Sequence, residues 1–162
     1  MKPVWLTLFL SLLAIAPVSG DEQRLSGIEG QWKLIEWHEG DVVLTPPEIG
    51  GRTSLTDGTV LFMVHNETAE GSEYVHGYGS YSVENNEYRY EYEKYVEVFV
   101  IGDDRQVSSG PVAETSYIAK PDGARLMIMD AETGTRGLVL EGDRMTWMHN
   151  GKPLRVYERV QD

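Results

Sequence analysis

The sequence of 162 residues contains no cysteine. Disulfides and thiol chemistry are therefore excluded, and an apolar core has to stabilise the fold. Beyond the first twenty residues, no stretch shows the 3.6-residue apolar period of an amphipathic helix. The long apolar run, residues 4–16, is shorter than the roughly 20 residues that a membrane-spanning helix needs.

Motifs of several enzyme classes are also missing. The chain has no G-x-G-x-x-G or P-loop spacing for a nucleotide, and no G-x-S-x-G motif around a nucleophilic serine. Its histidines form no H-x-H pair and no H-E-x-x-H motif; they are His38, His65, His76 and His149. We therefore assign no catalytic residue, and we expect neither a metal nor a cofactor.

Positive charge is scarce. The chain has 14 Lys and Arg residues against 26 Asp and Glu residues, which gives a formal net charge of −12 at pH 7. Such a charge repels the phosphates of nucleic acids and of anionic membranes. Nucleic acid is therefore not an expected partner, and a solvated acidic surface is the simplest interpretation.

The N-terminal segment has the pattern of an export signal. Lys2 precedes the apolar run, and the small residues 18–20 follow it, as in a cleaved signal peptide. We predict a signal peptide over residues 1–20 and a single domain over residues 21–162. The mature protein is then periplasmic or secreted, without membrane insertion after cleavage.

Short runs of alternating apolar and polar residues, separated by turn residues, fill the rest of the chain. They predict about nine or ten strands, and an antiparallel meander of that length has to close to hide its edges. The expected fold is all-β, an up-and-down β-barrel of about 8–10 strands. Residues 45–51, rich in proline and glycine, are expected to form a loop or lid, and residues 102–111 a polar loop.

Tyrosines gather in a predicted hairpin over residues 74–95. Asn85-Asn86 marks its tip, because asparagine tolerates the positive φ angles of a two-residue hairpin turn. Counting outward from this turn fixes the pairing, and serine, glutamate and arginine side chains then share the outer face. The predicted inner face carries Gly79, Tyr81, Val83, Tyr88, Tyr90 and Tyr92.

The same reasoning sets a register for other strands. Gly142-Asp143 and Asn150-Gly151 join the last three strands, and counting across these turns predicts two apolar rows. The rows are Leu138 with Trp147 and Leu154, and Leu140 with Met145 and Val156; Arg155 falls on the opposite face beside Thr146. In residues 29–38, alternation places Trp32, Leu34 and Glu36 on one face, and Lys33, Ile35 and Trp37 on the other.

Gly30-Gln31-Trp32 stands near the start of the first strand, and this Gly-x-Trp motif is typical of lipocalins and related calycins. Residues 78–83 (YGSYSV) and 157–160 (YERV) resemble the bacterial lipocalin-like domain, and the resemblance covers most of residues 25–160. It implies a barrel closed at one end, where Gly30 begins the strand and Trp32 packs under Arg159, with Arg155 as the alternative. It also implies a small apolar molecule as partner, entering the open end.

The inward-facing residues are candidates to line a ligand cavity. They are Tyr81, Tyr88, Tyr90, Tyr92, Tyr117, Met145 and Trp147. Tyrosine suits this role because it offers a broad apolar ring with one hydrogen-bonding tip. The leading hypothesis is therefore an exported protein that binds or carries an apolar or amphipathic molecule.

Alternatives stay open. The same side chains can fill a narrow barrel completely. An enzyme on this scaffold would use tyrosine, histidine and glutamate for acid–base chemistry, with Glu36 or Glu114 as the carboxylate. Tyr74, His76 and Tyr78 lie on the outer face, unless a bulge at Gly77 or Gly79 turns them inward.

Overall fold

The structure, a computed structural model, describes residues 26–161, so the predicted signal peptide lies outside the described part of the chain. Among these residues no helix has the length and apolar character needed to cross a membrane. They form a 3-10 turn, η1 (Ser26–Ile28), and a set of β-strands. The strands are β1 (Gly30–Glu39), β2 (Val42–Leu44), β3 (Ile49–Thr56), β4 (Thr59–Glu67), β5 (Ser72–Glu84), β6 (Glu87–Ile101), β7 (Asp104–Asp122), β8 (Arg125–Met129), β9 (Gly137–Glu141), β10 (Arg144–His149) and β11 (Lys152–Arg159).

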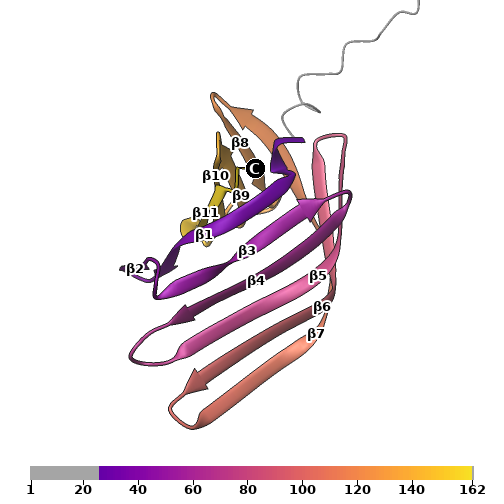
Figure 1. The fold of residues 1–162 in the computed structure, drawn as a ribbon. Coiled ribbons are helices and arrows are strands. Elements are labelled where there is room, and N and C mark those ends of the chain that lie inside the picture. The colour runs from indigo at the N-terminus through magenta and orange to yellow at the C-terminus, as the bar shows by residue number, and fades with distance from the viewer. Residues whose placement is uncertain (1–25, 162) are drawn as a thin grey trace, which may run out of the picture.

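Pairing between the first and last strands closes the sheet into a barrel (Figure 1). In the described residues, ten strands form the ring, and the short β2 extends β1 as a hairpin outside it. Neighbouring strands are antiparallel and follow the chain order around the ring. The predicted all-β, up-and-down antiparallel barrel is therefore confirmed.

The tyrosine hairpin has the predicted register. Asn85 and Asn86 have φ angles of 51° and 63°, and Tyr81 pairs with Tyr90 as the count from this turn requires. Beyond Gly79 the pairing shifts by one residue, through a bulge in β6. Tyr74, His76 and Tyr78 nevertheless remain exposed on the outer face of β5.

A bulge corrects the predicted faces of β1. The pairing of β1 with β11 shifts between Leu34 and Glu36. An extra residue in a strand reverses the faces of all side chains that follow it. Trp37 is therefore buried inside the barrel, whereas Glu36 leaves the face of Leu34 on which it was predicted.

A second bulge corrects the predicted register of β11. His149 pairs with Lys152 as expected, but the pairing shifts between Trp147 and Met148. Trp147 consequently pairs with Arg155 instead of Leu154, so the predicted outward position of Arg155 is wrong. The same shift breaks the other predicted row, in which Met145 was expected to face Val156. Met145 instead pairs with Tyr157, and Val156 pairs with Thr146.

Two predicted loops are partly strand. β3 begins at Ile49, within the proline- and glycine-rich segment, and continues through Gly50 and Gly51. Gly51 has a φ of +124°, and a Cβ there would overlap the backbone of Met63 on β4, so only glycine permits this close approach. The polar segment 104–111 belongs to β7, which shows no alternation there because neither of its faces is buried.

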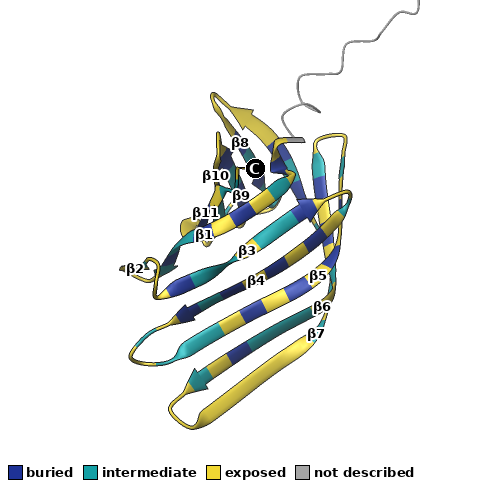
Figure 2. Ribbon diagram, in the orientation of Figure 1, coloured by how far each residue is buried: buried dark blue, intermediate teal, exposed yellow. Residues whose placement is uncertain are grey.

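One side of the barrel is incomplete. β6 pairs with β7 along residues 104–118, whereas β8 pairs with only residues 118–122 of β7. β8 to β11 have 5 to 8 residues each, against 13 to 19 for β5 to β7. The first half of β7 is accordingly a free, exposed edge, drawn in yellow in Figure 2.

Candidate ligand-binding cavity

A cavity of about 610 Å³ lies inside the barrel. One wall comes from β1 and β3 to β6, and the opposite wall comes from β9 to β11. The cavity also reaches Val112 on the free half of β7 and His149 at the end of β10, two strands that do not pair with each other. It is therefore accessible from the incomplete side of the barrel, and its volume is in the usual range of about 300–1,000 Å³ for small-molecule sites.

Most of the interior residues predicted from the sequence lie at this cavity. Its lining includes Tyr88, Tyr90, Tyr92, Met145 and Trp147. The other two are buried but do not line the cavity: Tyr81 donates a hydrogen bond of 2.8 Å to Glu29, and Tyr117 stacks on Tyr90 at 5.7 Å between ring centroids. The tyrosine wall thus continues from the solid core into the cavity.

Three aromatic rings form a cluster on one wall, which we call the aromatic trio: Phe62, Tyr92 and Tyr95. The ring centroids of Phe62 lie 5.1 Å from Tyr92 and 6.1 Å from Tyr95, and those of Tyr92 and Tyr95 are 6.1 Å apart. Gly77 makes room for the trio, because a Cβ there would stand 2.8 Å from the Phe62 ring. Neither Phe62 nor Tyr95 was predicted from the sequence to line a cavity, and the bulge in β6 gives Tyr95 its inward position.

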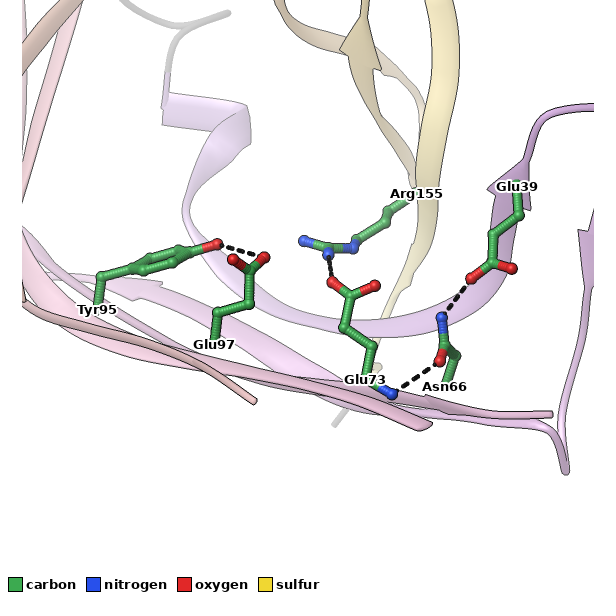
Figure 3. Close-up of polar contacts among 6 residues, drawn as sticks. All are labelled: Glu39, Asn66, Glu73, Tyr95, Glu97 and Arg155. Atoms are coloured by element: carbon green, nitrogen blue, oxygen red, sulfur yellow. Dashed lines mark hydrogen bonds and ion pairs between the residues drawn. The ribbon is translucent and has the colours of Figure 1, made fainter. Parts of the chain in front are cut away.

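Charged side chains from four strands meet at the accessible end of the cavity (Figure 3). Nη2 of Arg155 lies 3.3 Å from a carboxylate oxygen of Glu73, and the guanidinium lies 3.9 Å above the ring of Trp37. The buried Asn66 positions this group, since its amide donates to Glu39 at 2.6 Å and accepts the backbone N–H of Glu73 at 3.0 Å.

Glu97 is a further half-buried carboxylate at the cavity. In Figure 3 its carboxylate points toward the same space as the carboxylate of Glu73 and the guanidinium of Arg155, and the Tyr95 hydroxyl donates to it at 3.4 Å. No lysine or arginine among residues 26–161 lies within ion-pair distance of Glu97. The bulge in β6 also accounts for its inward position, opposite the buried Val75.

The environment shifts several pKa values upward. Burial raises the pKa of Glu73, Arg155 opposes this effect, and the negative charges of Glu97 and Glu39 add to it. Burial, together with the neighbouring Glu97, raises the pKa of Tyr95 to about 12. Burial likewise raises the pKa of Tyr88, Tyr90 and Tyr92. These phenols stay protonated at neutral pH, so they serve as hydrogen-bond donors and apolar walls.

The closed end of the barrel contains the motif residues. The Arg159 guanidinium lies 4.2 Å above the Trp32 ring and donates to the backbone carbonyls of Gly27 and Glu29. Gly30 leaves space for it, because a Cβ at Gly30 would meet the guanidinium at 2.5 Å. Arg155 stacks on Trp37 instead, so each of the two tryptophans of β1 has its own arginine from β11.

The glutamates considered for acid–base chemistry lie elsewhere. Glu36 is hydrogen-bonded to Arg144 at 2.7 Å and to His38 at 3.0 Å, and neither Glu36 nor the exposed Glu114 belongs to the cavity lining. The described residues contain no group of three or more His, Asp or Glu side chains arranged to hold a metal ion.

Comparisons with protein-family models, with curated proteins and with solved structures give no match to this chain. The fold and the site therefore define the class of protein by themselves. It is a closed ten-strand antiparallel barrel, consistent with a lipocalin-like fold and compatible with ligand binding.

Proposed function

We propose that this protein is an exported, lipocalin-like small-molecule-binding protein whose barrel holds an apolar or amphipathic molecule. The observation that carries the proposal is the accessible cavity of about 610 Å³ with aromatic walls. An interior that served only as a core would be closely packed, because an unfilled space loses the dispersion contacts of its lining. Aromatic walls with a few polar groups at one end are typical of sites that orient a small ligand.

Two further observations support the lipocalin-like assignment and the export. Arg159 stacks on Trp32 and lies against Gly30, the arrangement that the family resemblance implies for the closed end of the barrel. Residues 1–20 carry the pattern of an export signal. A ligand carrier without cysteine is suited to either an oxidising or a reducing compartment, since it has no thiol to oxidise.

The tyrosines and Glu36, which were considered for acid–base catalysis, fit that role poorly. A general base works best with a pKa near the pH at which the enzyme operates. The cavity tyrosines are shifted away from neutrality, and Glu36 is held in hydrogen bonds away from the cavity.

A paired substitution on β7 tests whether the cavity is the binding site. Val112 is half-buried and lines the cavity, whereas Val107 lies on the same strand, is exposed and is not part of the lining. Titration with Nile red, a neutral apolar dye, should give saturable fluorescence enhancement in the wild-type protein. Val112→Trp should weaken the binding by about tenfold, because the indole occupies the entrance, and Val107→Trp should leave it unchanged.

Circular dichroism and urea unfolding of both variants serve as the control for folding. Equal weakening by the two substitutions would assign dye binding to the outer surface. Absence of saturable binding to the wild-type protein would contradict the proposed function.

A further inference from the structure

Among the half-buried side chains that line the cavity, negative charges outnumber positive charges. Glu73 and Glu97 supply two carboxylates, and Arg155 supplies the one guanidinium among the partly buried lining residues. The remaining charged lining residues, Glu39 and Arg136, are exposed and of opposite sign. The partly buried charged side chains of the cavity therefore have a net negative charge.

The single guanidinium is already engaged. Arg155 contacts Glu73 at 3.3 Å and lies flat on Trp37. Its Nε–H is buried and has no partner among the described residues, so one donor stays available for a neutral acceptor. An incoming carboxylate or sulfate would meet Glu73 and Glu97 as well, and like charges at such a site repel.

Glu97, in contrast, faces the cavity without a cationic partner in residues 26–161. The only hydrogen bond that it accepts from a described side chain comes from the Tyr95 hydroxyl, at 3.4 Å. Tyr95 belongs to the aromatic trio, so the Glu97 carboxylate and the three aromatic rings line the same part of the cavity. A half-buried carboxylate beside clustered aromatic rings is the environment that binds an ammonium group, through charge and through cation–π attraction.

We propose that the ligand is an amphipathic organic cation, whose ammonium group binds at Glu97 against Phe62, Tyr92 and Tyr95. Its apolar part extends toward Tyr90, Met145 and Trp147 in the interior. The inference rests on the proposed binding function and adds the charge of the ligand. The net charge of −12 favours it further, because an acidic protein attracts cations and raises their rate of association.

A series of ligands with one tail and three head groups tests the charge. n-Octyltrimethylammonium, n-octanol and n-octanoate are titrated into the wild-type protein by isothermal calorimetry, below their aggregation concentrations and at physiological ionic strength. We expect the cation to bind about tenfold or more tightly than octanol, and octanoate to bind weakest. If none of the three binds, the proposed function itself fails. If octanol or octanoate binds as tightly as the cation, only the present inference is overturned.

Two substitutions on β6 separate the local charge from the net charge. Glu97→Gln removes the cavity carboxylate while keeping its shape, and Glu91→Gln removes an exposed carboxylate on the outer face of the same strand. The affinity for octyltrimethylammonium should fall about tenfold in E97Q and stay within about twofold in E91Q, and octanol should bind all three proteins equally. Equal losses in both variants, or none in E97Q, would contradict the assignment of Glu97.

Discussion

At the scale of single residues, Arg159 connects the last strand to the closed end of the barrel. It stacks on Trp32 and donates to two backbone carbonyls, at Gly27 and Glu29. We expect Arg159→Ala to lower the free energy of unfolding by about 1.5–4 kcal/mol, the sum of about 0.5–1 kcal/mol for the stack and about 1–3 kcal/mol for two hydrogen bonds. Arg159→Lys should recover only part of this loss, since an ammonium cannot reproduce the planar fork.

Urea denaturation followed by tryptophan fluorescence measures both changes. Arg125→Ala is the control, because Arg125 makes an exposed ion pair with Asp122 that should contribute less than about 1 kcal/mol. An R159A variant as stable as R125A would show that the stack at the closed end does not stabilise the barrel.

The cavity tyrosines predict a loss of stability at alkaline pH. Tyr95 has its pKa raised to about 12 in the folded protein, and Tyr88, Tyr90 and Tyr92 are shifted in the same direction. An unfolded chain releases phenol protons near pH 10, whereas the folded chain retains them. Their contribution is therefore complete below about pH 10, and stability falls as the pH rises toward about 12.

Thermal unfolding at a series of pH values, with tyrosinate absorbance recorded in parallel, tests this sign. The melting temperature should decline above about pH 10, and much of the tyrosinate signal should appear together with unfolding. A melting temperature that stays constant up to about pH 12 would contradict the burial of these hydroxyls.

At the scale of the strands, Gly79 lies where the backbone of β6 leaves no room for a side chain on β5. A Cβ at Gly79 would overlap the carbonyl oxygen of Glu91 and stand 2.8 Å from Cα of Tyr92. Because these are backbone atoms next to the bulge, Gly79→Ala should destabilise the protein by about 1–3 kcal/mol. Gly110→Ala on β7 meets nothing within 4 Å, so it should be neutral or slightly stabilising.

Chemical denaturation of the two variants compares them directly, and the affinity for Nile red adds a second readout. Because the bulge sets the inward positions of Tyr95 and Glu97, G79A should also weaken dye binding. A G79A protein with unchanged stability and unchanged binding would show that the bulge does not depend on this close approach.

The hairpin register could be predicted from the sequence because a local turn determines it. Asn85-Asn86 fixes each pair outward to Gly79, and the alternation of tyrosine with polar residues agrees with that count. For the same reason, the turns at Gly142-Asp143 and Asn150-Gly151 correctly predicted the residue pairs that lie next to them in β9 to β11. Patterns of period two thus determine strands and faces for as long as the pairing stays regular.

The rest of the site depends on bulges, which local alternation does not predict. Trp37, Tyr95, Glu97 and Arg155 all follow a shift in register, and each shift depends on how distant strands meet when the barrel closes. Trp37 pairs with Arg155 because of the shift in β1, and a regular pairing from Leu34 onward would place Glu36 opposite Arg155 instead. The aromatic character of the interior could therefore be predicted, but the identity of its charged residues could not.

At the scale of the whole molecule, the unequal strand lengths connect the fold to the proposed function. Long strands β5 to β7 and short strands β8 to β11 cannot pair along their full length, so one side stays open beside the cavity. The end of the barrel beside η1 is filled by η1, Trp32 and Arg159. A barrel that is solid at one end and hollow at the other is expected of a protein that holds a small molecule and releases it through the open side.

The measurement that tests this account most directly is native mass spectrometry of the protein purified from its own host under mild conditions. Wild-type protein and V107W should carry the mass of a small organic molecule that is lost on denaturation. V112W should carry less of it, because its indole occupies the cavity entrance. Three proteins with only the mass of the polypeptide, or equal loading of V112W and V107W, would contradict a ligand-binding cavity in the barrel.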